Sequence, residues 1–249
     1  GINLEDISAA KCFYIEEALK KQLDIPVIHD DQWGTATVTL AALINSLKVI
    51  GKKIDQVKIV ILGVGAAGSA ILKILDAFGA KNILLCDRQG IIYKGRKNNT
   101  PYKEKLASIT NPTQEKGDLS LAMKNADVFI GVSGPCLVTG AMVSLMNKLA
   151  IVFALANPQP EIMPDEAKKA GAYISASGRS DFPNQVNNAL VFPGVFRGAL
   201  NNKVKEISLK MLINAAQNLA ALVKNPNPEK IIPSIFDKGV VPAVAQAIK

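Results

Sequence analysis

The stretch Val57-Lys58-Ile59-Val60-Ile61-Leu62-Gly63-Val64-Gly65-Ala66-Ala67-Gly68 contains the pattern that decides the fold. The run Val57 to Leu62 is almost wholly apolar and does not alternate with polar residues, which is typical of a strand buried on both faces. Glycines follow at once, and Ala66 to Phe78 has the apolar spacing of a helix that ends at Gly79. The sequence therefore predicts a buried strand, a glycine turn and a helix in direct succession.

The three glycines of this turn have the spacing that a dinucleotide requires. Gly63 permits a tight turn, Gly65 lets backbone approach a pyrophosphate, and Gly68 allows the helix to pack closely on the strand. The free N–H groups of the helix N-terminus attract the phosphates. A second strand, Asn82 to Cys86, ends at an acid that can accept hydrogen bonds from the adenosine ribose. We expect a Rossmann-type domain that binds NAD or NADP through Gly63, Gly65, Ala66, Ala67, Gly68 and Asp87.

The choice between the two cofactors depends on the residues that follow the second strand. Asp87 disfavours a 2′-phosphate, whereas its neighbour Arg88 can stack on adenine or pair with that phosphate. Lys94, Arg96 and Lys97 lie in a polar stretch, for which a solvated loop is the simpler interpretation. The sequence favours NAD, with NADP as the alternative.

The remainder of the chain repeats the alternation of strand and helix. Alternating elements predict a doubly wound, mostly parallel α/β sheet with helices on both faces. The other predicted strands are 25–28, 126–132, 150–155 and 172–175, and the other predicted helices are one that starts behind Ser8, then 33–49, 204–223 and 241–248. We place residues 35–249 in the dinucleotide-binding domain and residues 1–34 in a short segment of a second domain.

Composition excludes several classes of function. The net charge is +8, but the lysines are interleaved with acids and aromatic residues are only 5% of the chain, so we expect no nucleic-acid partner. Three cysteines without paired spacing predict buried, reduced thiols in the cytoplasm. The uncharged stretch 128–147 is long enough to cross a membrane, but glycines and a proline interrupt it. It predicts a strand, a loop and a helix, with no membrane partner.

Two pairs of acids stand at the ends of predicted elements. Glu5-Asp6 precede a helix, and Asp30-Asp31 follow a short strand. Carboxylates that converge in a cleft repel one another unless a cation neutralises them, and oxygen ligands favour Mg²⁺ or Mn²⁺. The alternative is that these acids cap helices or face solvent, and composition alone does not separate the two interpretations.

Several motifs follow one another along the whole chain. They are Gly1-Ile2-Asn3-Leu4-Glu5-Asp6-Ile7, Ile25 to Ala36 with His29-Asp30-Asp31-Gln32-Trp33-Gly34, the glycine turn, Asp87-Arg88, Phe153 to Pro158 with Asn157, Ser177 to Asp181, Pro183 to Asn188, and Phe192-Pro193-Gly194. In this order they resemble the malic enzyme family in its compact bacterial form. Trp33 departs from it, because family members more often carry a smaller or polar residue there.

The resemblance implies roles for individual residues. Glu5, Asp6 and Asp31 would be the metal ligands, and Asp30 would support the catalytic lysine. Asn157, Asn187 and Asn188 would contact malate, and Asn157 would also contact the cofactor. Amides suit these places, because they fix a carboxylate or carboxamide without adding charge.

The implied reaction is the oxidative decarboxylation of malate to pyruvate and CO₂, with reduction of NAD(P) and a divalent metal ion. The family's lysine base and tyrosine acid lie upstream of Gly1, so we expect residues 1–249 alone to bind cofactor without oxidising malate. We also expect a cytoplasmic homodimer. Two alternatives stay open: an amino-acid dehydrogenase-like enzyme, which needs no metal, and a non-catalytic module that senses NAD.

Overall fold

The computed structural model describes all 249 residues except the side chain of Ala10. The elements in chain order are β1 (Ile2–Leu4), α1 (Ala9–Gln22), β2 (Val27–His29), α2 (Asp30–Ile50), η1 (Ile54–Gln56), β3 (Lys58–Leu62), α3 (Ala66–Phe78), β4 (Asn82–Asp87), β5 (Gly90–Ile91), α4 (Pro101–Ala107), α5 (Leu119–Met123), β6 (Val128–Gly131), α6 (Gly140–Val143), β7 (Ile151–Ala154), α7 (Pro164–Lys169), β8 (Ile174–Ser177), η2 (Asn188–Leu190), α8 (Phe192–Asn201), α9 (Leu209–Ala221) and α10 (Val240–Gln246).

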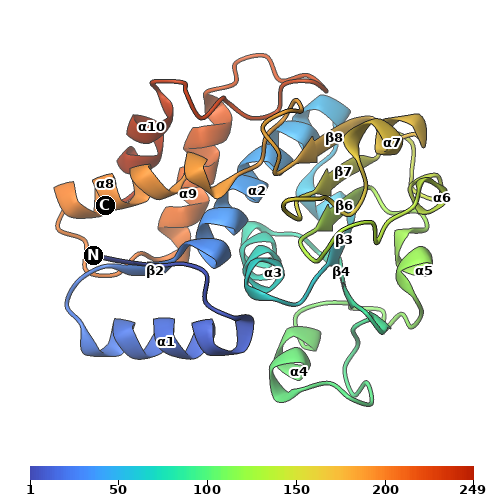
Figure 1. The fold of residues 1–249 in the computed structure, drawn as a ribbon, viewed down its shortest axis with the longest axis horizontal. Coiled ribbons are helices and arrows are strands. Elements are labelled where there is room, and N and C mark those ends of the chain that lie inside the picture. The colour runs from blue at the N-terminus through green and yellow to red at the C-terminus, as the bar shows by residue number, and fades with distance from the viewer.

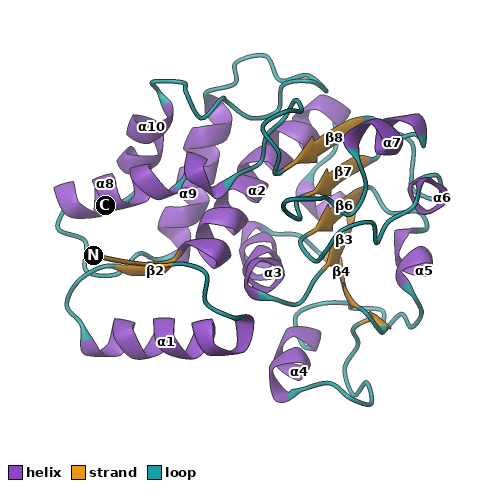
Figure 2. Ribbon diagram, viewed as in Figure 1, coloured by secondary structure: helices purple, strands orange, loops and turns teal.

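The main sheet has six strands in the order β5-β4-β3-β6-β7-β8 (Figure 2). All neighbours are parallel except the short edge strand β5, which pairs antiparallel with β4. The chain moves outward in one direction from β3 to β4 and in the other from β6 to β8. The order of strands therefore reverses between β3 and β6, which is the switch point at which doubly wound sheets bind ligands. The predicted fold class is confirmed.

The sheet is buried on both faces because alternate side chains of each strand enter two different cores. On one face, Ile59 and Ile61 pack in a core with α2, α3 and α9. On the other face, Val60 and Leu62 pack in a second core with α5, α6 and α7. Figure 1 shows these two groups of helices on opposite sides of the sheet. The unbroken apolar run in β3 follows from this double burial.

The N-terminal residues form a separate small sheet. Strands β1 and β2 pair in parallel, with Leu4 opposite His29, and neither joins the main sheet. Helix α1 connects them and lies beside them at the lower left of Figure 1. The division into residues 1–34 and 35–249 stays a prediction, and its boundary falls within helix α2.

The C-terminal helices differ most from the expectation. The predicted helix 204–223 begins only at Leu209, because the Ser208 hydroxyl caps it by accepting from the Met211 amide. Helix α8 is absent from the sequence-based prediction, and it contains Pro193, Gly194 and Gly198, residue types that are unfavourable inside helices. Its glycines are needed for packing: a Cβ on Gly194 would lie 2.5 Å from the Val244 Cβ of α10. The glycines of α8 therefore reflect close packing against α10 rather than a turn.

Smaller boundaries also differ. Helix α2 begins at Asp30 rather than near Trp33, so Asp30 and Asp31 lie in its first turn. The stretch 93–103 contains the start of α4, which Thr100 caps. The last strand is Ile174–Ser177, two residues later than predicted. Cys136 is exposed, so the prediction of three buried thiols is wrong for that residue.

One helix, α2, is long and apolar enough to cross a membrane by length and composition, and 72% of its apolar window is buried within the fold. The stretch 128–147 forms the predicted strand, loop and helix.

Candidate functional site

The glycine turn lies between β3 and α3, next to the switch point. Gly63 has φ of +121°, and a Cβ there would lie 2.7 Å from the Val132 carbonyl oxygen. A Cβ on Gly68 would collide with the carbonyl oxygen of Gly63. A Cβ on Gly65 would meet only the Cβ of Ala9, at an ordinary 4.0 Å. The fold thus requires the first and third glycines, whereas the space over Gly65 is open.

The N-terminus of α3 is available to a ligand. Gly65 is its N-cap residue, and no side chain caps the helix at this end. The first backbone N–H groups of the helix, at Ala66 and Ala67, are among those without a partner inside it. An anion over Gly65 would face these groups and the positive end of the helix dipole.

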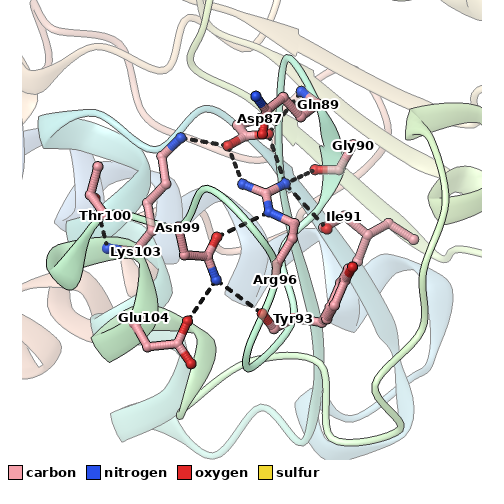
Figure 3. Close-up of polar contacts among 10 residues, drawn as sticks. All are labelled: Asp87, Gln89, Gly90, Ile91, Tyr93, Arg96, Asn99, Thr100, Lys103 and Glu104. Atoms are coloured by element: carbon pink, nitrogen blue, oxygen red, sulfur yellow. Dashed lines mark hydrogen bonds and ion pairs between the residues drawn. The ribbon is translucent and has the colours of Figure 1, made fainter.

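Asp87, which we expected to contact the adenosine ribose, is the centre of a hydrogen-bond network (Figure 3). Its Oδ1 accepts from Arg96 Nη1 at 3.0 Å, and its Oδ2 accepts from Arg96 Nη2 and Lys103 Nζ, both at 2.6 Å. The Gln89 amide also donates to Oδ1. Burial raises the pKa of the Asp87 carboxyl, but the bonds from Arg96 and Lys103 outweigh burial and hold the pKa at about 2. Asp87 is therefore ionised and paired at neutral pH.

Arg96 corrects the interpretation of its segment as a solvated loop. Its side chain is only 7% exposed and also donates to the carbonyl oxygens of Gly90 and Ile91 and to the Asn99 side chain. Figure 3 shows the guanidinium enclosed by these groups. Its partners lie up to nine residues away and share no motif with it, so local sequence offered no signal. Arg88, in contrast, is exposed.

The network bears on the discrimination between the two cofactors. An unpaired aspartate repels a 2′-phosphate, whereas Asp87 shares its charge with two cations. Lys103 is the more exposed cation, with 27% of its side chain accessible. One carboxylate against two cations leaves a net positive charge at this end of β4, which the sequence did not predict.

The four acids of the N-terminal region come together through the small sheet. Pairing of Leu4 with His29 places Glu5-Asp6 beside Asp30-Asp31, and the Asp6 amide donates to Asp31 Oδ2 at 2.9 Å. Burial, and then the charges of Glu5 and Asp31, raise the pKa of Asp30 to about 6.

The acids are close, but they do not surround a common point. Among the described side chains, the structure has no group of three or more His, Cys, Asp or Glu placed to hold a metal ion. Glu5 and Asp6 are exposed, and Asp31 is partly exposed. Mutual repulsion keeps such carboxylates apart unless a cation is present.

The three asparagines have different surroundings. Asn188 Nδ2 donates to Asp30 Oδ2 at 2.8 Å, which ties η2 to the acid cluster. Asn187 caps η2 by accepting from the Ala189 amide at 2.9 Å. Asn157 is exposed after β7, and a Cβ on Gly178 would lie 2.8 Å from its amide nitrogen. The structure thus joins Asn188 to the acids and leaves Asn157 at the carboxyl edge of the main sheet.

A cleft of about 820 Å³ lies between α1 and α4, beside Val64 of the glycine turn. Phe13 and Tyr102 stack in it with ring centroids 4.4 Å apart. Glu16 is buried there and accepts from the Trp33 indole at 3.0 Å. The walls of this cleft come from segments far apart in the chain, so no local sequence pattern marks it.

Comparison with known proteins identifies the family. Residues 32–248 match the family model described as the malic enzyme NAD-binding domain. The bifunctional malic/malolactic enzyme of Bacillus subtilis is 51% identical over 251 residues, which cover 100% of this chain and 61% of that protein. The NAD-dependent malic enzyme of Geobacillus stearothermophilus is 50% identical, with 100% and 52% covered. A relative from Halomonas elongata is named an NADP-dependent malic enzyme.

A solved structure agrees. The NAD-dependent malic enzyme of Thermotoga maritima superposes with a TM-score of 0.96 and 47% identity, over 100% of this chain and 66% of that chain. The chain spans about half to two thirds of the length of these relatives. The family, the Rossmann-type fold and the nicotinamide dinucleotide as its cofactor class all agree with the sequence-based predictions. The chain therefore belongs to the malic enzyme family.

Proposed function

We propose that this chain forms the cofactor- and metal-binding part of an enzyme that oxidises and decarboxylates malate to pyruvate and CO₂. The observation that carries the proposal is the arrangement of the glycine turn. Gly63 and Gly68 are explained by packing within the fold, whereas the open space over Gly65 is not. Family membership favours this reaction over that of an amino-acid dehydrogenase.

The cofactor half of the proposal rests on the carboxyl edge of the sheet. A pyrophosphate over Gly65 would accept hydrogen bonds from the first N–H groups of α3. The adenosine would then extend toward β4, where Asp87 would accept from the ribose, with exposed Arg88 beside it. We propose NAD as the preferred cofactor, because the Asp87 carboxylate can accept a hydrogen bond from the ribose 2′-hydroxyl that NADP lacks. NADP would be a weaker ligand, whose 2′-phosphate the accessible Lys103 would contact.

The metal half rests on the acid cluster. The donor set consists of carboxylate oxygens, which suit Mg²⁺ or Mn²⁺. Burial, and after it the charges of Glu5 and Asp31, raise the pKa of Asp30, and a cation would relieve the second of these causes. We propose that Glu5, Asp6 and Asp31 hold the ion and that Asp30 supports them, oriented by the amide of Asn188. Bound there, the divalent ion would polarise the hydroxyl and carbonyl oxygens and stabilise the enolate charge, while the nicotinamide would accept the hydride.

The chain's own residues would orient malate and the nicotinamide without adding charge to the site. Asn157 and the pair Asn187-Asn188 would donate amide hydrogen bonds to the carboxylates of malate, and Asn157 would also reach the nicotinamide side. We also propose that the enzyme is a homodimer that acts in the cytoplasm.

The test of the reaction uses a chimera. The 249 residues replace the matching 66% of the Thermotoga maritima enzyme, and NADH and pyruvate formation from malate are measured with Mn²⁺. Equal amounts of the two products, lost when Mn²⁺ is chelated or when Asp31→Asn is introduced, are expected. NADH with oxaloacetate as the accumulating product, or turnover indifferent to Mn²⁺, would contradict the proposed reaction. Cofactor binding without any turnover in the chimera would favour a non-catalytic NAD-sensing module.

A further inference from the structure

Glu161 is a buried acid that none of the roles above uses. Its side chain is fully buried, and it lies in the loop between β7 and α7. Its Oε1 accepts from the Ser133 amide at 2.8 Å, and its Oε2 accepts from the Ala156 amide at 3.2 Å. Ser133 follows β6, and Ala156 follows β7. One carboxylate therefore joins the loops that leave two neighbouring strands.

The surrounding backbone is shaped to admit this side chain. A Cβ on Gly131, the last residue of β6, would lie 2.5 Å from the Glu161 Cδ. The Glu161 carbonyl oxygen accepts from the Val138 amide, so the same residue contacts the β6 loop twice. Burial raises the pKa of the Glu161 carboxyl, while the bonds from Ser133 and Ala156 act in the opposite direction. A buried carboxylate is costly unless its hydrogen bonds offset the lost hydration, so this arrangement needs a reason.

The two loops border the part of the sheet that the nicotinamide must occupy. The glycine turn follows β3, and Asp87 ends β4 on one side of it. If the adenosine extends toward β4, the other half of the dinucleotide extends across the switch point, toward β6 and β7. Ala156 directly precedes Asn157 in the sequence. Val132 directly precedes Ser133, and its carbonyl oxygen lies next to Gly63 of the glycine turn.

We propose that Glu161 is a positioning residue that holds the loops after β6 and β7 in register and so builds the nicotinamide half of the cofactor site. The inference rests on the proposed function. Glu161 acts only through backbone: it fixes the Ser133 and Ala156 amides and thereby the places of their neighbours. It makes no contact with the cofactor.

The test compares a ligand that contains the nicotinamide with one that lacks it. Affinities for NAD and for ADP-ribose, which lacks the nicotinamide, are measured by calorimetry for the wild type and for Glu161→Gln. The glutamine keeps the shape but has one acceptor oxygen, so one of the two amides loses its partner. We expect NAD affinity to fall about threefold to tenfold, as one lost hydrogen bond implies, with ADP-ribose affinity unchanged.

The matched control is Asp127→Asn. Asp127 is another buried acid that accepts from a backbone amide, that of Lys58, but it lies at the opposite, amino edge of β6. This variant should lose stability without changing the ratio of the two affinities. An equal loss of both ligands in Glu161→Gln, or no loss of either, would overturn the positioning role. A wild type that binds neither ligand would instead refute the proposed function, and this inference with it.

A second measurement needs no variant. If the carboxylate holds both loops, the Ser133 and Ala156 amides exchange with deuterium as slowly as amides of the adjoining strands, in the absence of ligand. Fast exchange at both amides in the wild type would overturn the proposal even if Glu161→Gln failed to fold.

Discussion

Replacement of Asp87 by asparagine should destabilise the protein at neutral pH, because the change leaves buried Arg96 without its anion. The side chains of Asp87 and Arg96 are 11% and 7% exposed, so solvent screens the pair little. A pKa lowered from 3.8 to about 2 corresponds to about 2 kcal/mol of unfolding free energy, at 1.4 kcal/mol per tenfold. The uncompensated guanidinium adds to this loss, so we expect a total of about 2–4 kcal/mol for Asp87→Asn.

The dependence on pH has a definite sign. Because the folded protein lowers the pKa of Asp87, the stabilisation is complete well above pH 3.8 and is lost as pH falls through about 2. At about pH 3, roughly half of it should remain. Urea unfolding followed by the fluorescence of Trp33, the single tryptophan, measures the difference between wild type and variant at each pH.

The control is another arginine–aspartate pair with two hydrogen bonds, which lies on the surface. Arg179 contacts Asp181 through two bonds of 2.8 and 2.6 Å, but the side chains are 34% and 54% exposed. Asp181→Asn should therefore lower the free energy of unfolding much less than Asp87→Asn does. Equal losses for Asp87→Asn and Asp181→Asn, or a loss for Asp87→Asn that does not shrink toward low pH, would refute this reasoning.

Three further predictions concern ligands. Gly65→Ala should fold normally, since its Cβ has room, and calorimetry should show NAD binding at least tenfold weaker. Gly68→Ala should instead lower the melting temperature, because its Cβ would collide with Gly63. Unchanged NAD affinity in Gly65→Ala would show that the turn is not part of the cofactor site. Asp87→Ala should reduce the difference in binding free energy between NAD and NADP by about 1–3 kcal/mol, because charge-assisted hydrogen bonds to the ribose are lost. A wild type that binds NADP more tightly than NAD would contradict the proposed cofactor preference. Asp31→Asn should weaken Mn²⁺ binding in the chimera more than Asp30→Asn does, and equal effects would contradict the division into ligand and support.

The glycine turn shows how much local sequence determines. Backbone conformation and close approach depend on the residue itself and its immediate neighbours, so the roles of Gly63 and Gly68 could be predicted from their spacing. The double burial of β3 likewise follows from its unbroken apolar run. Helix α8 could not be predicted in this way, because its Gly194 is required by contact with Val244, 50 positions further along the chain. The residues next to Gly194 in the sequence give no indication of that contact.

The family, the doubly wound sheet and the turn that a dinucleotide needs could be predicted from the sequence, because they depend on short-range patterns and on the steric freedom of glycine. The pairing of the charges depends instead on contacts that form in the folded chain. Arg96 and Lys103 meet Asp87, and Glu161 meets Ser133 and Ala156, across distances in sequence that no local pattern spans. The energy of a charge depends on its burial and on every neighbour within several ångströms, and both quantities exist only once the chain has folded.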